Sequence, residues 1–108
     1  MNSNEGIILI SDAIEDHWLK LSEFCELCQL QIEQVEDLID TGFLEPASQW
    51  PEWRFTPGSL ARTRRLLRLR QDLELDWSGA VLAVELLEQM DQLRRRLREL
   101  ELALATRG

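Results

Sequence analysis

The stretch QIEQVEDLIDTGFLEP, from Gln31 to Pro46, predicts a helix that ends in a tight turn. Its apolar residues recur at the spacing of one helix face: Ile32, Val35, Leu38 and Ile39. Thr41-Gly42 follows, and glycine readily takes the left-handed backbone conformation in which many helices end. We therefore expect a helix that starts at Gln31, stops at Thr41 and turns one face to a core.

A shorter amphipathic segment lies directly before this helix. Ser22 is a suitable N-cap for a helix over Glu23–Leu30, with Phe24, Leu27 and Cys28 facing inward. Two short helices separated by so brief a break are typical of a helix-turn-helix.

The first of these helices contains a CxxC pair, Cys25 and Cys28. That spacing can hold zinc or support redox chemistry. One pair supplies half of the ligands of a four-coordinate zinc site, and His17 is the only histidine of the chain. We interpret both cysteines as small apolar core residues and expect no metal and no cofactor. A metal-sensing module is the less favoured alternative.

Short strands are expected on both sides of the helix pair. Apolar residues over Ile7–Ile10 and alternation over His17–Leu21 predict strands before it. Phe43–Pro46 and Trp53–Thr56 predict a hairpin after it, a wing whose loop is Ala47–Glu52. The sequence thus favours a mostly α fold with a small β wing.

Thr56-Pro57 predicts the start of a third helix, because it joins an N-cap to a proline at the first helical position. This helix should run from Pro57 to about Leu73. Its apolar face is made of leucines: Leu60, Leu66, Leu67, Leu69 and Leu73. Its polar face is made of arginines: Arg62, Arg64, Arg65, Arg68 and Arg70. Leu75–Gly79 then breaks the helix, with Asp76 suited to cap the next one and Trp77 to anchor the corner.

The last helix should run from about Ser78 to Ala105, roughly 40 Å at 1.5 Å per residue. Its apolar residues alternate steps of four and three: Leu86, Met90, Leu93, Leu97, Leu100 and Leu104. This heptad seam extends beyond the core that a small domain needs, and such a seam requires a partner helix. We expect a homodimer through a coiled coil, rather than a helix packed only on its own domain.

The charge is segregated along the chain, whose formal net charge is −8. From Met1 to Trp53 there are twelve acidic residues and one lysine, whereas Arg54 to Arg70 holds six arginines and no acid. Modules that bind DNA rely on Lys and Arg to release counterions, so the acidic balance favours a basic protein partner over nucleic acid. The arginine row is expected to pair with acidic helices of the same chain or of a second copy.

Several function classes are disfavoured by the sequence. No apolar run reaches the length of a membrane span, and the N-terminus lacks the features of a signal peptide, so we expect a cytoplasmic protein. No nucleophile, phosphate loop or metal motif stands in a catalytic arrangement, so we expect no enzyme.

Three segments resemble the DNA-binding module of MerR-type regulators: Leu21–Phe24 at the start of the first helix, Thr41–Pro46 at the end of the second and Trp53–Phe55 in the returning wing strand. The resemblance implies a winged helix-turn-helix followed by a long helix that pairs in an antiparallel dimer. DNA-binding relatives carry basic residues and tyrosine in the second helix. Here that helix carries carboxylates instead: Glu33, Glu36, Asp37 and Asp40.

A narrower resemblance covers the run RLRQDLELDWSGA, Arg68 to Ala80, together with the opening Ser22–Cys25. These residues look like the CbpM family of chaperone modulators, which is MerR-like in fold and does not regulate transcription. The resemblance implies binding to the J domain of the DnaJ-like co-chaperone CbpA and interference with its work on DnaK. A J domain meets DnaK through a basic helix, which an acidic surface can cover.

The resemblance and the charge pattern together give the expected site. Contacts to the J domain are expected at Glu33, Glu36, Asp37, Asp40, Trp50, Asp76 and Trp77. Trp53 is expected to fill the wing's own core, whereas for Trp50 core filling and partner contact are equally open. The expected organisation is an acidic lead-in over residues 1–16, the winged helix-turn-helix over 17–75 and the dimerisation helix over 76–108. The alternative is a MerR-type DNA-binding regulator that contacts phosphates through Arg62, Arg64, Arg65 and Arg68.

Overall fold

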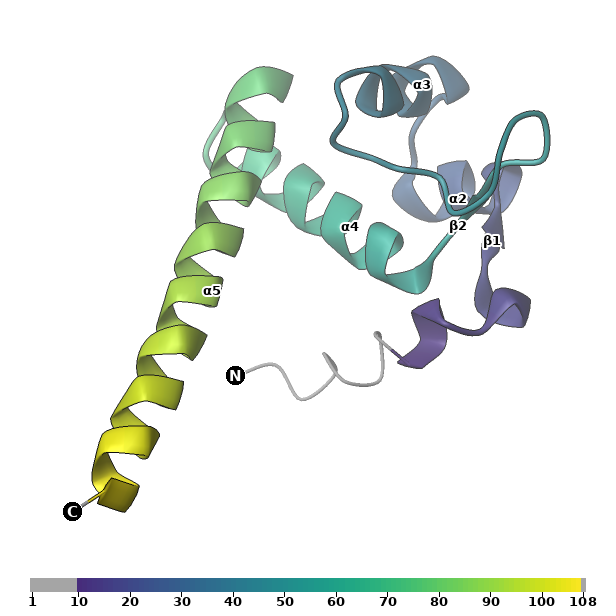
Figure 1. Cartoon of the computed structure of the whole chain (residues 1–108). Coiled ribbons are helices and arrows are strands. Elements are labelled where there is room, and N and C mark those ends of the chain that lie inside the picture. The colour runs from purple at the N-terminus through teal and green to yellow at the C-terminus, as the bar shows by residue number, and fades with distance from the viewer. Residues whose placement is uncertain (1–9, 108) are drawn as a thin grey trace. The chain divides into compact units, whose positions relative to one another are not determined.

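The computed structural model describes residues 10–107, and these are mostly helical. In chain order the elements are the 3₁₀ helix η1 (Glu15–His17), strand β1 (Leu19–Lys20), helices α2 (Leu21–Cys28) and α3 (Ile32–Asp40), strand β2 (Arg54–Phe55), and helices α4 (Pro57–Asp72) and α5 (Trp77–Arg107) (Figure 1). The chain divides into two compact units, one ending at Arg65 and one beginning at Leu66. Helix α4 contributes to both.

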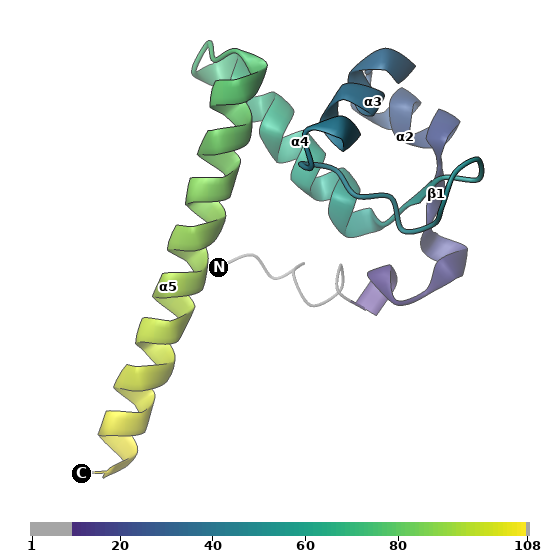
Figure 2. The same ribbon diagram turned by 45° about the horizontal axis from the view of Figure 1, so that its top comes forward.

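Helices α2 and α3 form the expected helix-turn-helix and lie next to each other in Figures 1 and 2. Gln29 ends α2 in the left-handed conformation with φ 55°, and the Leu30 N–H donates to the Cys25 carbonyl at 3.0 Å. Gln31 is the N-cap of α3, and its N–H donates to Gln34 Oε1 at 2.9 Å. Two residues in a fixed turn therefore suffice to redirect the chain.

The expected start of the first helix is wrong by two residues. Helix α2 begins at Leu21, and its N-cap is Lys20 rather than Ser22. The Lys20 N–H donates to the Glu23 carboxylate at 3.0 Å, so a side chain three residues on supplies the capping interaction instead of a serine hydroxyl. The buried face is set by Phe24 and Cys28, and Leu27, expected inside, is 44% exposed.

The wing differs from the expected hairpin. Strand β2 pairs with β1, Leu19 opposite Phe55, rather than with Phe43–Pro46, which forms no strand. Gly42 takes φ 84°, and the Leu44 N–H donates to the Leu38 carbonyl at 3.1 Å. This turn folds the chain back over the end of α3, so that Phe43 and Leu44 enter the core instead of pairing.

The expected strand over Ile7–Ile10 falls mostly outside the described residues, and Ile10 itself belongs to a helical turn. The expected strand over His17–Leu21 is confirmed only at Leu19–Lys20.

Aromatic stacking lies at the centre of the first unit. Phe24 and Phe55 are fully buried, and their rings stack with centroids 4.5 Å apart. Val35 from α3 is also fully buried. The helix-turn-helix and the strand pair are therefore joined by one apolar core.

The start of α4 is fixed by two caps, of which Thr56 was predicted and Asp12 was not. Thr56 Oγ1 accepts the Ser59 N–H at 3.1 Å, and the Asp12 carboxylate accepts the Gly58 N–H at 2.7 Å. Trp18 Nε1–H donates to the backbone carbonyl of Asp12 at 2.9 Å, which holds this part of the lead-in in place. The described lead-in is thus part of the first unit.

In the second unit, Asp76 caps α5 as predicted, because its carboxylate accepts the Gly79 N–H at 2.7 Å. Glu74, with φ 52°, makes the corner between α4 and α5. Helix α5 has 31 residues, so it is roughly 46 Å long. None of the helices within residues 10–107 combines the length and apolarity of a membrane span.

A candidate protein-interaction surface

The four carboxylates of α3 form one exposed stripe. Glu33, Glu36, Asp37 and Asp40 follow the spacing i, i+3, i+4 and i+7, which places them on one face of a helix, and all four are exposed. Val35 and Leu38, on the opposite side, are 0% and 4% exposed. Burial of that side fixes the orientation of α3 and so presents the acidic stripe to solvent. We call these four residues the acidic stripe.

The stripe is unfavourable for the helix that carries it. Like charges at i, i+4 each destabilise a helix by about 0.2–0.5 kcal/mol, and two such pairs occur, Glu33 with Asp37 and Glu36 with Asp40. Asp40 also lies in the last turn, where the helix dipole disfavours an anion. No basic residue close in sequence offsets this repulsion, since all eight charged residues from Leu21 to Trp53 are acidic. Glu33, in the first turn, is the one stripe residue that the helix dipole favours. A local rule that is broken at the other positions is typical of a functional surface.

Ile32 borders the stripe, although its spacing had placed it on the buried face. It is the first residue of α3 and is 50% exposed. Because Ile32 and Glu36 are four residues apart, they lie one turn apart on the same side of the helix. An apolar residue therefore accompanies the carboxylates on the exposed face.

Trp50 lies in the loop between Pro46 and β2 and is 69% exposed. Its ring meets Trp53 edge-on with centroids 5.1 Å apart, and Trp53 meets Phe55 edge-on at 6.5 Å. Trp53 is half-buried, so it partly fills the core, whereas Trp50 does not. Its role as a partner contact stays a prediction.

Asp76 and Trp77 belong to the second unit, where both have a structural role. The Asp76 carboxylate caps α5. The Arg70 guanidinium lies over the half-buried Trp77 ring, 4.3 Å from its centroid, which is the geometry of a cation–π contact. These contacts hold the corner between α4 and α5. The expected partner contacts of Asp76 and Trp77 also stay a prediction.

Three arginines of α4, namely Arg62, Arg64 and Arg70, contact carbonyls or aromatic rings of their own chain. Arg62 donates to the Phe43 carbonyl, and its guanidinium lies 4.0 Å from the centre of the Phe43 ring. Arg64 donates to the Leu27 carbonyl at 3.3 Å. Arg62 therefore holds the segment after α3, and this role competes with the phosphate contact of the DNA-binding alternative.

Both cysteines were expected in the core, but only Cys28 is buried there, and Cys25, also on α2, is half-buried. Burial raises the pKa of the Cys28 thiol to about 11, and burial together with Glu33 raises the pKa of Cys25. Both therefore stay protonated near neutral pH, whereas metal binding and nucleophilic attack require the thiolate. Among residues 10–107 no group of three or more His, Cys, Asp and Glu side chains is arranged to hold a metal ion.

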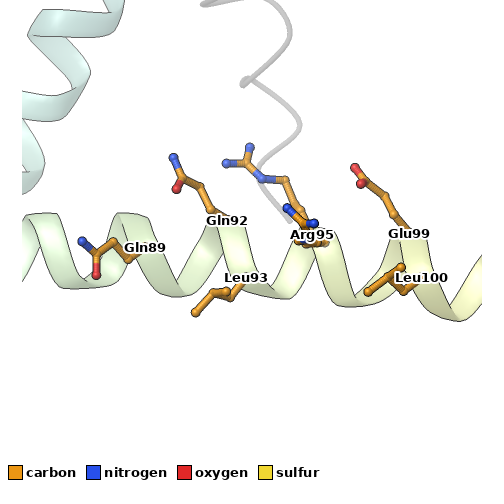
Figure 3. A pocket seen from close by; sticks show the side chains of 7 residues that line it. Gln89, Gln92, Leu93, Arg95, Glu99 and Leu100 are labelled. Atoms are coloured by element: carbon orange, nitrogen blue, oxygen red, sulfur yellow. The ribbon is translucent and has the colours of Figure 1, made fainter.

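All six residues of the α5 seam are exposed: Leu86 by 50%, Met90 by 43%, Leu93 by 67%, Leu97 by 56%, Leu100 by 56% and Leu104 by 66%. In Figure 3, Leu93 and Leu100 extend from one side of α5, and Gln92, Arg95 and Glu99 from the other. The side chains drawn there line a shallow pocket to which, within the described chain, α5 alone contributes. A single helix does not enclose a small molecule, so we do not assign a ligand to it.

Comparison with known proteins supports the expected family. The family of MerR HTH regulatory proteins matches residues 19–102, from β1 through most of α5. Pseudomonas putida has a relative named chaperone modulatory protein CbpM that is 36% identical over 77 residues, 70% of this chain and 76% of the relative. Proteins of the same name are 35% identical over 76 residues in Citrobacter koseri, covering 69% of this chain and 75% of the relative, and 34% identical over 86 residues in Salmonella arizonae, covering 79% and 85%.

This chain belongs to the CbpM family. The three relatives are named as chaperone modulators, and neither that name nor the MerR description indicates an enzyme.

Two features of this CbpM-family chain were missed by sequence reasoning. One is the exposure of Ile32, which periodicity alone assigns to the core. The other is Asp12, which precedes the matched residues and caps a helix 46 positions further on. The only sequence signal for Asp12 is an acidic residue before a helix start, and this is too common to be diagnostic.

Proposed function

We propose that this chain binds the J domain of a DnaJ-like co-chaperone of the CbpA type and prevents its cooperation with DnaK. The observation that carries the proposal is the acidic stripe, whose four carboxylates are all exposed and have no base near them in sequence. A J domain presents a basic helix to DnaK. The stripe and that helix are complementary in charge, so the modulator and DnaK would compete for one surface.

Membership of the CbpM family supports a chaperone-modulating role, and the charge of the surface supports the choice of partner. Opposite potentials accelerate the encounter and set the orientation of the two proteins. A DNA phosphate backbone would be repelled by the same stripe. The MerR-type DNA-binding alternative would need Arg62 for a phosphate contact, and Arg62 already contacts Phe43.

The same proposal includes a homodimer through α5. Six exposed apolar residues in a heptad pattern on one helix are the feature that supports it. A dimer would carry two acidic stripes and could bind two J domains.

Charge reversal of the stripe tests the partner. Glu36→Lys with Asp37→Lys should weaken binding of a purified CbpA-type J domain by a few kcal/mol, about a hundredfold, because attraction becomes repulsion at a partly desolvated surface. Calorimetry gives the affinity, and circular dichroism shows whether the helices persist. In the same samples, the wild type should suppress J-domain-stimulated ATP hydrolysis by DnaK, and the variant should not.

The matched control is Glu15→Lys with Asp16→Lys. These two residues are adjacent, acidic and exposed in η1, so the change in net charge is identical. The control should lose little affinity. Equal losses of affinity in both variants would mean that net charge alone, rather than the acidic stripe, determines binding. An unchanged affinity in the folded α3 variant would exclude the acidic stripe as the contact.

A further inference from the structure

The Trp50 side chain is exposed, but its ring is held in place by aromatic contacts. Its edge-on contact to Trp53 continues through Phe55 to Phe24, so four aromatic rings connect the tip of the loop to the core. The last two are fully buried. A large apolar side chain is thus held in water by a rigid support.

The backbone around Trp50 is fixed as well. The Ser48 hydroxyl donates to the Glu52 carbonyl at 2.6 Å, and the Glu52 N–H donates to the Gln49 carbonyl at 3.2 Å. The Ala47 N–H donates to the Arg54 carbonyl at 2.8 Å and closes the base of the loop. A residue already ordered in the free protein loses little conformational entropy on binding. Rigid exposed tryptophans are for this reason effective binding anchors.

The charges near Trp50 narrow the choice of partner. Glu45 and Glu52 flank it in the chain, and the Glu52 side chain is 79% exposed. Arg54 pairs with Glu52 at 3.4 Å, and this base is largely covered, at 33% exposure. An anionic membrane surface or a nucleic acid would meet these carboxylates unfavourably. A protein surface with an apolar cleft and basic side chains at its rim matches both the ring and its surroundings.

We propose that Trp50 is the apolar anchor of the interface, inserting into a cleft between basic helices of the protein that the acidic stripe attracts. This inference rests on the proposed function for the identity of that partner. It assigns distinct roles to two parts of the first unit. The acidic stripe provides a salt-dependent attraction that also sets encounter rate and orientation, and Trp50 adds a salt-independent share of the affinity through buried apolar area.

The division of roles predicts distinct responses to salt. At physiological ionic strength, salt largely screens exposed charges that are more than about 8 Å apart. The burial of apolar area is not screened in this way. Removing Trp50 should therefore lower the affinity at every salt concentration and leave the salt dependence unchanged. Removing charges of the stripe should flatten the salt dependence.

The experiment is a calorimetric titration of a CbpA-type J domain with the full-length chain and its Trp50→Ala variant at several salt concentrations. Trp50→Ala should weaken binding at least tenfold, with a parallel dependence of log Kd on log salt. Ile10→Ala is the matched control, since Ile10 is as exposed as Trp50, 67% against 69%, and lies in the same unit. It should bind within a factor of two of the wild type.

A second readout follows the ring itself. The chain has four tryptophans, so labelling with 5-fluorotryptophan gives four ¹⁹F signals, and Trp50→Phe identifies one of them. That signal should lose its solvent isotope shift between H₂O and D₂O when the J domain is added, because the ring leaves water. The same signal should not respond to phosphatidylglycerol vesicles or to mixed-sequence duplex DNA.

The outcomes separate the two proposals. If the wild type binds the J domain and Trp50→Ala weakens that binding by less than tenfold, the inference is overturned and the proposed function stands. If the wild type does not bind at all, the proposed function is overturned, and the partner assigned to Trp50 with it. A Trp50 signal that responds to vesicles or DNA instead would assign the ring to a different surface.

Discussion

Helix α3 and the C-terminal half of α5 are both amphipathic, but only α3 buries its apolar side within its own unit. The apolar side of α3 is buried, with Val35 at 0% and Leu38 at 4% exposure. The apolar side of α5 is open, with Leu93 at 67% and Leu97 at 56%. In α3 the exposed face is the charged one, whereas in α5 it includes the seam.

This difference indicates two kinds of contact to other molecules. An exposed acidic face on a packed helix attracts a partner without being required for folding. An exposed leucine seam is a liability in water unless another helix covers it. Variants of the α3 stripe should therefore lose partner binding, whereas variants of the α5 seam should lose the dimer.

The largest effect is expected from the seam. Leu93→Asp with Leu97→Asp should convert the proposed dimer to monomers, because each substitution would place an unpaired carboxylate in an apolar helix pair at a cost of several kcal/mol. Sedimentation at tens of micromolar measures the mass. Helical circular dichroism should decrease only modestly, since the first unit does not depend on these residues.

Leu102→Asp is the control for that variant. Leu102 is as exposed as Leu93, 66% against 67%, but lies on the side of α5 away from the seam. It should leave the dimer intact. A wild-type chain that sediments as a monomer at this concentration would contradict the dimer and leave the seam to another partner.

The next largest effect is expected in the core of the first unit. Phe24→Ala should destabilise the chain by about 3–5 kcal/mol, as truncation of a buried phenylalanine generally does. Phe24 is fully buried and stacks on Phe55. Urea unfolding followed by circular dichroism measures the free energy. Leu27→Ala, on the same helix but 44% exposed, should cost far less. Equal losses of unfolding free energy in the two variants would mean that both faces of α2 contribute to stability.

Local chemistry made several elements predictable. Thr56-Pro57 and Asp76 cap α4 and α5 through bonds within three residues, so the sequence alone was sufficient to place both starts. The spacing of the carboxylates in α3 likewise determines that they share a face. The heptad seam of α5 follows from the same kind of periodicity.

Non-local contacts were not predictable in this way. The partner of β2 is Leu19–Lys20, some 35 positions back along the chain, and periodicity does not choose between two candidate strands. Phe43 and Leu44 look like strand residues, yet they fill the core because the Gly42 turn directs them there. Trp53 packs its ring edge-on against Phe55 and is half-buried, whereas Trp50 is 69% exposed, and the residue types alone do not distinguish the two tryptophans.

The smallest effect is expected at Asp12. This residue joins the lead-in to the first unit by capping α4. Asp12→Ala should cost about 1 kcal/mol, because the Gly58 N–H would lose its partner at the start of α4. For a chain of this size the midpoint of thermal unfolding should fall by roughly 4–8 °C. Asp16→Ala, exposed in η1, is the control for loss of one negative charge. The sedimentation of the dimer should not change.

A second substitution makes this test independent of net charge. A Cβ at Gly58 would collide with the Asp12 carboxylate, so Gly58→Ala should destabilise the wild type. In the Asp12→Ala background the collision is absent, and alanine is a better helix residue than glycine by up to about 1 kcal/mol. Gly58→Ala should therefore change from destabilising to neutral or stabilising. Additive losses in the double variant would contradict the contact between Asp12 and α4, because residues that touch are expected to couple.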